Sequence, residues 1–118
     1  MRACLVTGFV VVAPSGNIHC HLTKQSARCD IVKRDWTPPA KPRSCELDFG
    51  RGVFVEPRGR ADHVCAGDTT MNDGGRLTYG ATPARGTLRC RSARSGMRCS
   101  SLRSGHGFSL LRRRVRFF

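Results

Sequence analysis

Seven cysteines in a chain of 118 residues constrain this protein more than any other feature. They are spread along the whole chain, at Cys4, Cys20, Cys29, Cys45, Cys65, Cys90 and Cys99. Zinc modules usually bring two ligands together as Cys-x2–4-Cys, and no two of these cysteines are that close. The spacing therefore favours disulfides, which persist in oxidising, extracytoplasmic compartments.

The segment around the second and third cysteines predicts a β-hairpin closed by a disulfide. One register places three apolar pairs on the same face: Ile18 with Ile31, Cys20 with Cys29, and Leu22 with Ala27. The other face then carries His21 opposite Arg28, and His19 opposite Asp30, which we expect to form an ion pair. A slip by one residue would destroy both the disulfide and the apolar face, so the pattern specifies the register.

A second hairpin is predicted around Cys90 and Cys99, which have the same separation. Its apolar face would carry Leu88, Cys90, Met97 and Cys99. Arg89, Arg91 and Arg98 would lie on its other face, with Arg91 opposite Arg98. Like charges that face each other across strands are unfavourable, so we expect this face to be solvated or to bind an anion.

Cys45 and Cys65 remain, and we pair them as the third disulfide. The chain-entropy model assigns about 3 kcal/mol to each bridge, or about 8–9 kcal/mol to the three together. That is comparable with the whole net stability of a typical domain. Reduction is therefore expected to unfold the protein.

Helical periodicity is nearly absent, and short β-type runs are separated by Gly, Pro, Asn and Asp clusters. The expected strands are Phe9–Val12, Asn17–Leu22, Ala27–Val32, Gly52–Val55, Ala61–Cys65, Leu77–Tyr79, Thr87–Arg91, Met97–Ser100 and Phe108–Leu111. The proline-rich segment Trp36–Pro42 should be an extended crossing, with Trp36 covering one end of the core. The pattern predicts an all-β fold: a small disulfide-stapled β-sandwich or partly open β-barrel built from hairpins.

Domain organisation is simple after an ambiguous N-terminus. The apolar run in residues 1–13 fits either a truncated leader or a first strand, and it is too short to span a membrane. Cys4, the odd cysteine, lies in this segment. Residues 14–118 are expected to form a single disulfide-rich β domain.

A series of short motifs runs along nearly the whole chain, from about Phe9 to Phe118. They are Ser15-Gly16-Asn17-Ile18-x-Cys20, Arg28-Cys29-Asp30-Ile31, Trp36-x-Pro38-Pro39, Cys45-x-Leu47-Asp48-x-Gly50, Cys65-Ala66-Gly67-Asp68-Thr69, Tyr79-Gly80, Leu88-x-Cys90 and Ser104-Gly105-His106-Gly107-Phe108-Ser109. In this order they resemble an uncharacterised family of small secreted or envelope-associated actinobacterial proteins. The resemblance implies export, six paired cysteines and a compact β fold, and it implies no activity. Two features depart from the resemblance: the apolar run before Pro14 is shorter than the full leader that the family implies, and the C-terminal end is strongly cationic.

The net charge of +13, from 21 basic and 8 acidic residues, favours anionic partners. The candidate anion-binding residues are Arg89, Arg91, Arg98, Arg112, Arg113 and Arg114. The terminal arginines could bind anionic lipid or wall polymer, or could belong to a final strand with Val115 and Phe117 facing inward. Base composition of the genome could also account for part of the arginine content. No stretch alternates basic residues with stacking aromatics, as single-strand nucleic-acid binders do.

Candidate chemistry is sparse, and no cofactor is implied. His106, Asp68 and Trp36 are candidate ligand contacts, although a tight turn, an Asx-turn and a core position explain them better. His19 and His21 share a face and could ligate a metal. Asn72 and Asp73 lack the spaced acidic run of a calcium loop. No Gly-x-Ser-x-Gly nucleophile pattern is present, and we expect no enzyme.

These observations predict a secreted or envelope-associated, non-enzymatic module that binds an anionic envelope polymer, lipid headgroups or an extracellular protein partner. One alternative is a secreted hydrolase or an enzyme inhibitor, in which His106 and Asp68 would converge. Another is a nucleic-acid-binding basic protein, which charge alone supports.

Overall fold

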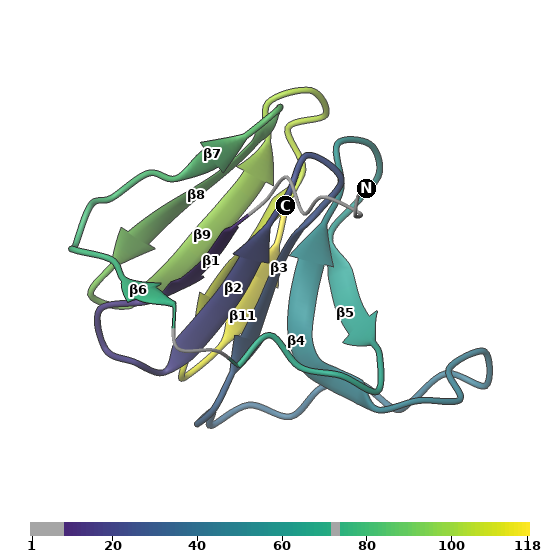
Figure 1. Ribbon diagram of the computed structural model, residues 1–118. Coiled ribbons are helices and arrows are strands. Elements are labelled where there is room, and N and C mark those ends of the chain that lie inside the picture. Colours follow the sequence, from purple (N-terminus) through teal and green to yellow (C-terminus); the bar gives the residue numbers. More distant parts are fainter. Residues whose placement is uncertain (1–8, 72–73) are drawn as a thin grey trace, which may run out of the picture.

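A computed structural model describes residues 9–71 and 74–118, which form strands and no helix. The strands are β1 (Phe9–Val12), β2 (Ile18–Leu22), β3 (Ala27–Ile31), β4 (Phe49–Val55), β5 (Asp62–Cys65), β6 (Gly75–Arg76), β7 (Ala84–Arg85), β8 (Leu88–Ala93), β9 (Gly96–Ser101), β10 (Gly107–Leu111) and β11 (Val115–Phe117). They build two sheets that pack face to face (Figure 1). The all-β prediction is confirmed, in the form of a sandwich.

The two sheets repeat one plan. The first has the order β5-β4-β3-β2-β1 with the short β6 added in parallel to β1, and the second has the order β11-β10-β9-β8-β7. Each is therefore an antiparallel meander of five consecutive strands. The resemblance between the two predicted hairpins extends to the whole of both sheets.

Both predicted registers are present. In the first hairpin Cys20 lies opposite Cys29, with the pairs Ile18–Ile31 and Leu22–Ala27 on either side, all of them buried. In the second hairpin Cys90 lies opposite Cys99 and Arg91 opposite Arg98. The strands there run further than predicted, to Ala93 and from Gly96.

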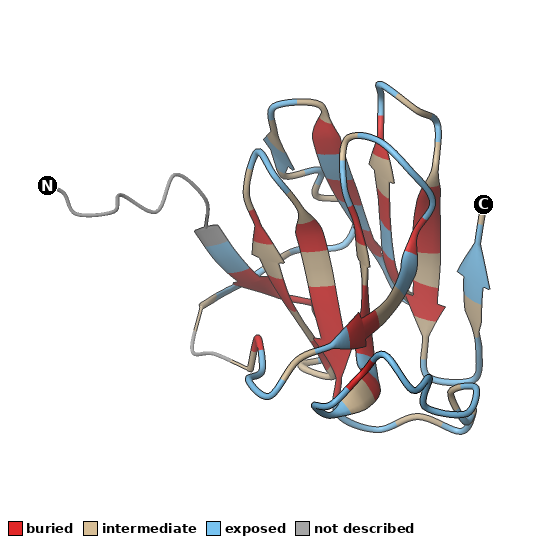
Figure 2. Cartoon of the chain, turned by 90° about the vertical axis from the view of Figure 1, so that its right-hand side faces the viewer, coloured by how far each residue is buried: buried red, intermediate tan, exposed pale blue. Residues whose placement is uncertain are grey.

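Three disulfides join Cys20 to Cys29, Cys45 to Cys65, and Cys90 to Cys99, the pairs expected from the sequence. The two hairpin disulfides are buried in the centre of the core, and the Sγ atoms of Cys29 and Cys99 are 3.8 Å apart across the sandwich. Around them pack the inward side chains of both sheets, including Leu22, Val53 and Phe108, all fully buried. Figure 2 shows buried residues, in red, along strands of both sheets. The core is therefore sulfur-centred and only two side chains deep.

One glycine in each sheet allows close backbone approach beside the inner cysteine. Gly52 on β4 lies opposite Asp30, and Gly107 on β10 lies opposite Ser100. A Cβ added to Gly52 would lie 2.3 Å from the carbonyl oxygen of Cys29. One added to Gly107 would lie 2.2 Å from the carbonyl oxygen of Cys99, so both positions exclude any side chain and mark the same place in the repeat.

Other strand predictions need correction. The strand predicted at Leu77–Tyr79 is wrong, because pairing stops at Arg76 and the chain turns at Tyr79 after Leu77 has packed against the core. Strand β7 was not predicted, since two residues after a proline show no alternation. Strand β4 begins at Phe49 rather than Gly52, because an irregular pairing with β5 precedes Val53.

The long segment between β3 and β4 runs along one end of the sandwich without strand structure, as predicted for its prolines (Figure 1). Its Trp36 is half-buried against the core, and its indole Nε1 donates a hydrogen bond to the carbonyl oxygen of Leu111 at 2.9 Å. Trp36 thus closes the end of the core as expected. Cys4 and the rest of residues 1–8 lie outside the described residues, whereas Phe9–Val12 are the first strand.

Candidate anion-binding site

The outer face of the second sheet carries a concentration of arginines. Leu88, Cys90, Met97 and Cys99 point into the core, so alternation along the strands turns Arg89, Arg91 and Arg98 outward, and all three are exposed. On β11 the exposed Arg116 follows the inward Val115 in the same way. We call Arg89, Arg91, Arg98 and Arg116 the arginine face.

Strand register sets three of these side chains in one row across the sheet. Arg91 lies opposite Arg98, Arg98 opposite Ser109, and Ser109 opposite Arg116. Neighbouring strands are about 4.8 Å apart, so the row crosses four strands at regular intervals. The guanidinium carbon of Arg98 lies 4.1 Å from the ring centroid of Phe118, a cation–π contact that orients this arginine.

Among the described residues, no Asp or Glu side chain pairs with these four arginines. All eight Asp and Glu residues of the chain precede residue 74, whereas eleven of its 21 basic residues follow it. Within residues 9–71 and 74–118, none of the four guanidinium groups of the arginine face forms an ion pair. The second sheet is therefore a purely cationic layer.

A shallow cavity of about 180 Å³ lies within the arginine face. Its lining residues are Thr82, Arg89, Cys90, Arg91, Arg98 and Ser100. Arginines and hydroxyl groups are the side chains that proteins use to bind phosphate and sulfate groups. The arrangement can therefore hold a small oxyanion or successive anionic groups of a polymer.

On the outer face of the first sheet, the charge of Arg28 is neutralised by carboxylates of the same chain. The carboxylate of the fully buried Asp30 accepts hydrogen bonds from Arg28 Nε and Nη2, both at 3.2 Å, and from Thr69 Oγ1 and the Thr70 amide at 3.1 and 3.0 Å. Arg28 Nη1 also contacts Asp68 at 2.9 Å. Burial by itself would lower the pKa of Arg28, but the hydrogen bonds and charges of these two carboxylates raise it above its ordinary value.

This network corrects one expectation and places one candidate. His19 does lie opposite Asp30, but the ion pair of Asp30 is with Arg28 on its own strand. Asp68, proposed as a ligand contact, pairs with the same arginine. Its hydrogen bond and the positive charge of Arg28 hold the pKa of Asp68 below its ordinary value.

His106, the other half of the hydrolase hypothesis, lies elsewhere. It follows β9 in the turn to β10, and its Nδ1 is 3.1 Å from the carbonyl oxygen of Phe118. Asp68 is bound to the outer face of the first sheet and His106 to the end of the second, so the structure does not bring the two together.

The terminal arginines divide into two groups. Arg112, Arg113 and Arg114 are exposed in the turn between β10 and β11, at one end of the sandwich, where Arg112 Nε lies 3.7 Å from Asp35. Only Arg116 joins the arginine face. The sequence did not predict that Arg116 lies in the same row as Arg98, or that Phe118 contacts Arg98. The absence of acidic residues after Asp73 was visible in the sequence.

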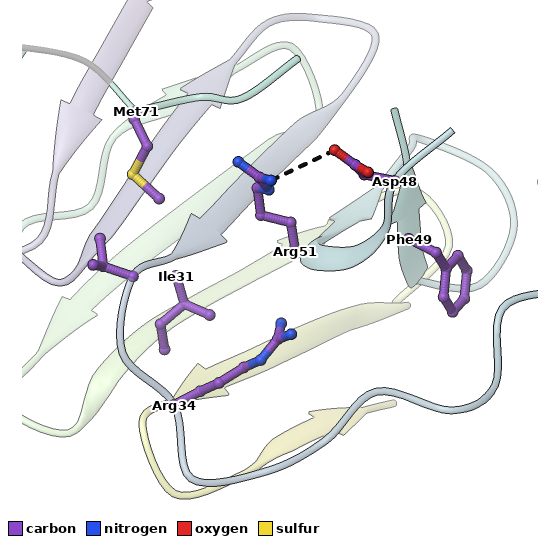
Figure 3. A pocket seen from close by; sticks show the side chains of 7 residues that line it. Ile31, Arg34, Asp48, Phe49, Arg51 and Met71 are labelled. Atoms are coloured by element: carbon purple, nitrogen blue, oxygen red, sulfur yellow. Dashed lines mark ion pairs between the residues drawn. The ribbon is translucent and has the colours of Figure 1, made fainter. Parts of the chain in front are cut away.

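A larger open cavity, of about 460 Å³, lies beside the end of β3 and the start of β4 (Figure 3). Arg51 Nη2 is 3.5 Å from Asp48 Oδ2 there. Arg34 donates a hydrogen bond to the carbonyl oxygen of Gly50 and stacks on Trp36 at 4.8 Å. Both cations of this cavity thus have an oxygen partner within the chain, whereas the described residues provide none for the guanidinium groups of the arginine face.

A half-buried histidine marks the open edge of the sandwich between β5 and β11. The His63 ring lies 5.1 Å from Phe117, 5.7 Å from Phe49 and 6.1 Å from Trp36. Its Nδ1 is buried and has no hydrogen-bond partner among the described residues. Burial lowers the pKa of His63 below its ordinary 6.5, Asp62 opposes this, and the charge of Arg34 lowers it further.

In the described parts of the chain, no group of three or more His, Cys, Asp or Glu side chains is arranged so that it could hold a metal ion. His19 and His21 share the outer face of β2 opposite Asp30 and Arg28. The calcium hypothesis at Asn72 and Asp73 falls outside the described residues. Across residues 9–71 and 74–118 there is also no helix of the length and apolarity needed to cross a membrane.

Comparison with known proteins places the chain in a family. A family model described as a family of unknown function (DUF6636) matches residues 3–118. No curated protein and no solved structure matches the chain.

Proposed function

The chain belongs to DUF6636, a family of unknown function, and we propose that it is an exported, non-enzymatic module that binds a polyanion of the cell envelope through the arginine face. The observation that carries the proposal is the set of four exposed arginines on three strands with no carboxylate among them. Cations held side by side repel one another, and an anionic ligand relieves that repulsion.

Two features favour a polymer over a lipid surface as the ligand of the arginine face. Membrane-surface binding depends on apolar side chains that insert beside the charges. The exposed large apolar side chains of the described residues are Val10, Val32, Leu47, Tyr79, Leu102 and Phe117, and none of them lies on the arginine face. A row of three arginines and one serine, which crosses four strands, instead matches anionic groups repeated along a chain.

Export is supported by the three disulfides. Such bonds persist in oxidising compartments and are rare in the reducing cytosol. Two of them form the centre of the core, so we expect the fold to require oxidation. An oxidised module of this kind would meet anionic envelope polymers directly.

The test measures affinity for long-chain polyphosphate by fluorescence anisotropy, at low salt and with added NaCl. The face variant is Arg91→Gln/Arg98→Gln, and the matched control is Arg58→Gln/Arg60→Gln, which removes the same charge from the exposed turn between β4 and β5. We expect the face variant to bind about tenfold more weakly or worse, and the control to change about threefold or less. Salt should weaken every complex, because exposed charges are screened over about 10 Å at 0.1 M.

Two results would overturn the proposal. The first is no binding of the wild-type protein to polyphosphate at low salt. The second is an equal loss in both double variants, which would show that net charge rather than the arginine face determines binding. Tighter binding to vesicles containing phosphatidylglycerol, or to duplex DNA, than to polyphosphate would assign the face to another class of anion.

A further inference from the structure

The repeat relates one residue pair in the first sheet to one pair in the second. Arg28 and Asp30 flank the inner cysteine Cys29, and Arg98 and Ser100 flank Cys99 in the same way. Asp30 lies opposite Gly52, the close-approach glycine of its sheet, and Ser100 lies opposite Gly107, the counterpart. Arg98 therefore corresponds to Arg28, and Ser100 corresponds to Asp30.

In the first sheet the chain supplies its own anion. The Asp30 carboxylate takes two hydrogen bonds from Arg28 and two more from Thr69 and Thr70, and its side chain is fully buried. An arginine at this position of the repeat therefore forms an ion pair when a carboxylate lies two residues further along the strand.

In the second sheet the carboxylate is replaced by the short hydroxyl of Ser100. The cavity beside it is lined by Thr82 and by three arginines, Arg89, Arg91 and Arg98. Arg98 is already oriented by its contact with the Phe118 ring, 4.1 Å from the ring centroid. Three arginines from two strands and two hydroxyl-bearing residues thus line a cavity at Ser100, the strand position that corresponds to Asp30.

We propose that this cavity is a seat for one tetrahedral oxyanion, a phosphate or sulfate group, bound where the repeat places the Asp30 carboxylate. The inference rests on the proposed function, because it names the chemical group of the polyanion that the arginine face recognises. A tetrahedral group offers oxygens in several directions, and so can accept from Arg91, Arg98 and a hydroxyl at once. A carboxylate has two oxygens, and their acceptor sites lie in one plane.

The experiment uses Ser100→Asp, which restores the carboxylate of the first sheet. Its control is Ser15→Asp, which adds the same charge in the turn before β2, where Ser15 Oγ already accepts a hydrogen bond from the Asn17 amide. Calorimetric titrations in phosphate-free buffer use inorganic phosphate, sulfate and acetate as separate probes. Polyphosphate and phosphatidylglycerol vesicles then distinguish polymer from lipid headgroups as the source of the phosphate.

We expect wild-type protein to bind phosphate and sulfate more tightly than acetate. Ser100→Asp should weaken phosphate binding at least about tenfold, whereas Ser15→Asp should change it about threefold or less. If Ser100→Asp proves unfolded by circular dichroism, Arg98→Lys replaces it, with Arg58→Lys as control. A lysine keeps the charge but loses the two-pronged geometry, so phosphate affinity should fall only for Arg98→Lys.

Equal phosphate binding by Ser100→Asp and Ser15→Asp, or acetate binding as tight as phosphate, would overturn the seat. Neither result would overturn the proposed function, because polyphosphate affinity of Arg91→Gln/Arg98→Gln is measured separately. If that double variant and its control bind polyphosphate with equal affinity, both proposals are wrong.

Discussion

The Sγ atom of Cys29 lies 3.8 Å from the Sγ atom of Cys99, so the two hairpin disulfides touch at the centre of the sandwich. Each bridge therefore serves as a crosslink within its own sheet and as a packing element between the sheets. Cys65, by contrast, is exposed, and its bridge to Cys45 lies at the periphery.

This arrangement predicts that the disulfides contribute unequally to stability. Loop entropy alone ranks Cys45–Cys65, whose cysteines are 20 positions apart, slightly above Cys20–Cys29, whose cysteines are 9 positions apart. We expect the opposite order: Cys20→Ala/Cys29→Ala should lower the free energy of unfolding about 1–2 kcal/mol more than Cys45→Ala/Cys65→Ala, because it also removes buried packing. Guanidinium denaturation of the oxidised proteins measures both, and an order that follows loop length would contradict the packing role.

Because the Asp30 carboxylate is buried, we expect its replacement by an amide to lower the free energy of unfolding strongly. Asp30→Asn removes the charge that Arg28 faces, and Thr69 and Thr70 lose a charged acceptor. The free energy of unfolding should fall by about 2–3 kcal/mol. Asp48→Asn, which breaks the exposed pair with Arg51, should cost about 0.5 kcal/mol or less. Similar losses in the two variants would show that burial of Asp30 is unimportant.

His63 predicts a dependence of stability on pH. Its pKa is lowered in the folded protein, so between the folded and unfolded pKa values the unfolded chain binds the proton more readily. Its contribution should be fully present above about pH 6.5 and lost as the pH falls through the lowered folded pKa. Melting temperatures across this range should depend less on pH in His63→Phe than in the wild type, while His21→Phe should retain the wild-type dependence. An unchanged profile in His63→Phe would contradict the assignment.

We expect any side chain at Gly107 to clash with the backbone of β9 and with Phe118, whose ring contacts Arg98 of the arginine face. A Cβ there would lie 2.2 Å from the Cys99 carbonyl oxygen and 2.8 Å from the Phe118 ring. Gly107→Ala should therefore cost about 2–3 kcal/mol of unfolding free energy, typical of an overpacked site. Gly75→Ala, where a Cβ meets nothing within 4 Å, is the control and should be close to neutral. Equal thermal stability of the two variants would count against the close approach.

The hairpins were predictable because period-two alternation and the cysteine separations both require the same register at Ile18 and Leu88. The pairing of β4 with β5 and the short strand β7 were harder to predict, since glycine-rich and two-residue strands show little alternation of apolar and polar residues. Arg89, Arg91 and Arg98 were placed on one face from the sequence alone. Their meeting with Arg116 depends on β11 pairing with β10, and the placement of Asp68 depends on a loop that local patterns do not position.

The most direct test of the arginine face maps polyphosphate contacts by NMR, using the backbone amides and arginine Nε–H resonances of the oxidised protein. The account predicts that shifts concentrate on Arg89, Arg91, Arg98 and Arg116, and that Arg58 and Arg60 remain unchanged. Shifts centred on the turn of Arg112, Arg113 and Arg114, or spread evenly over all arginines, would contradict it.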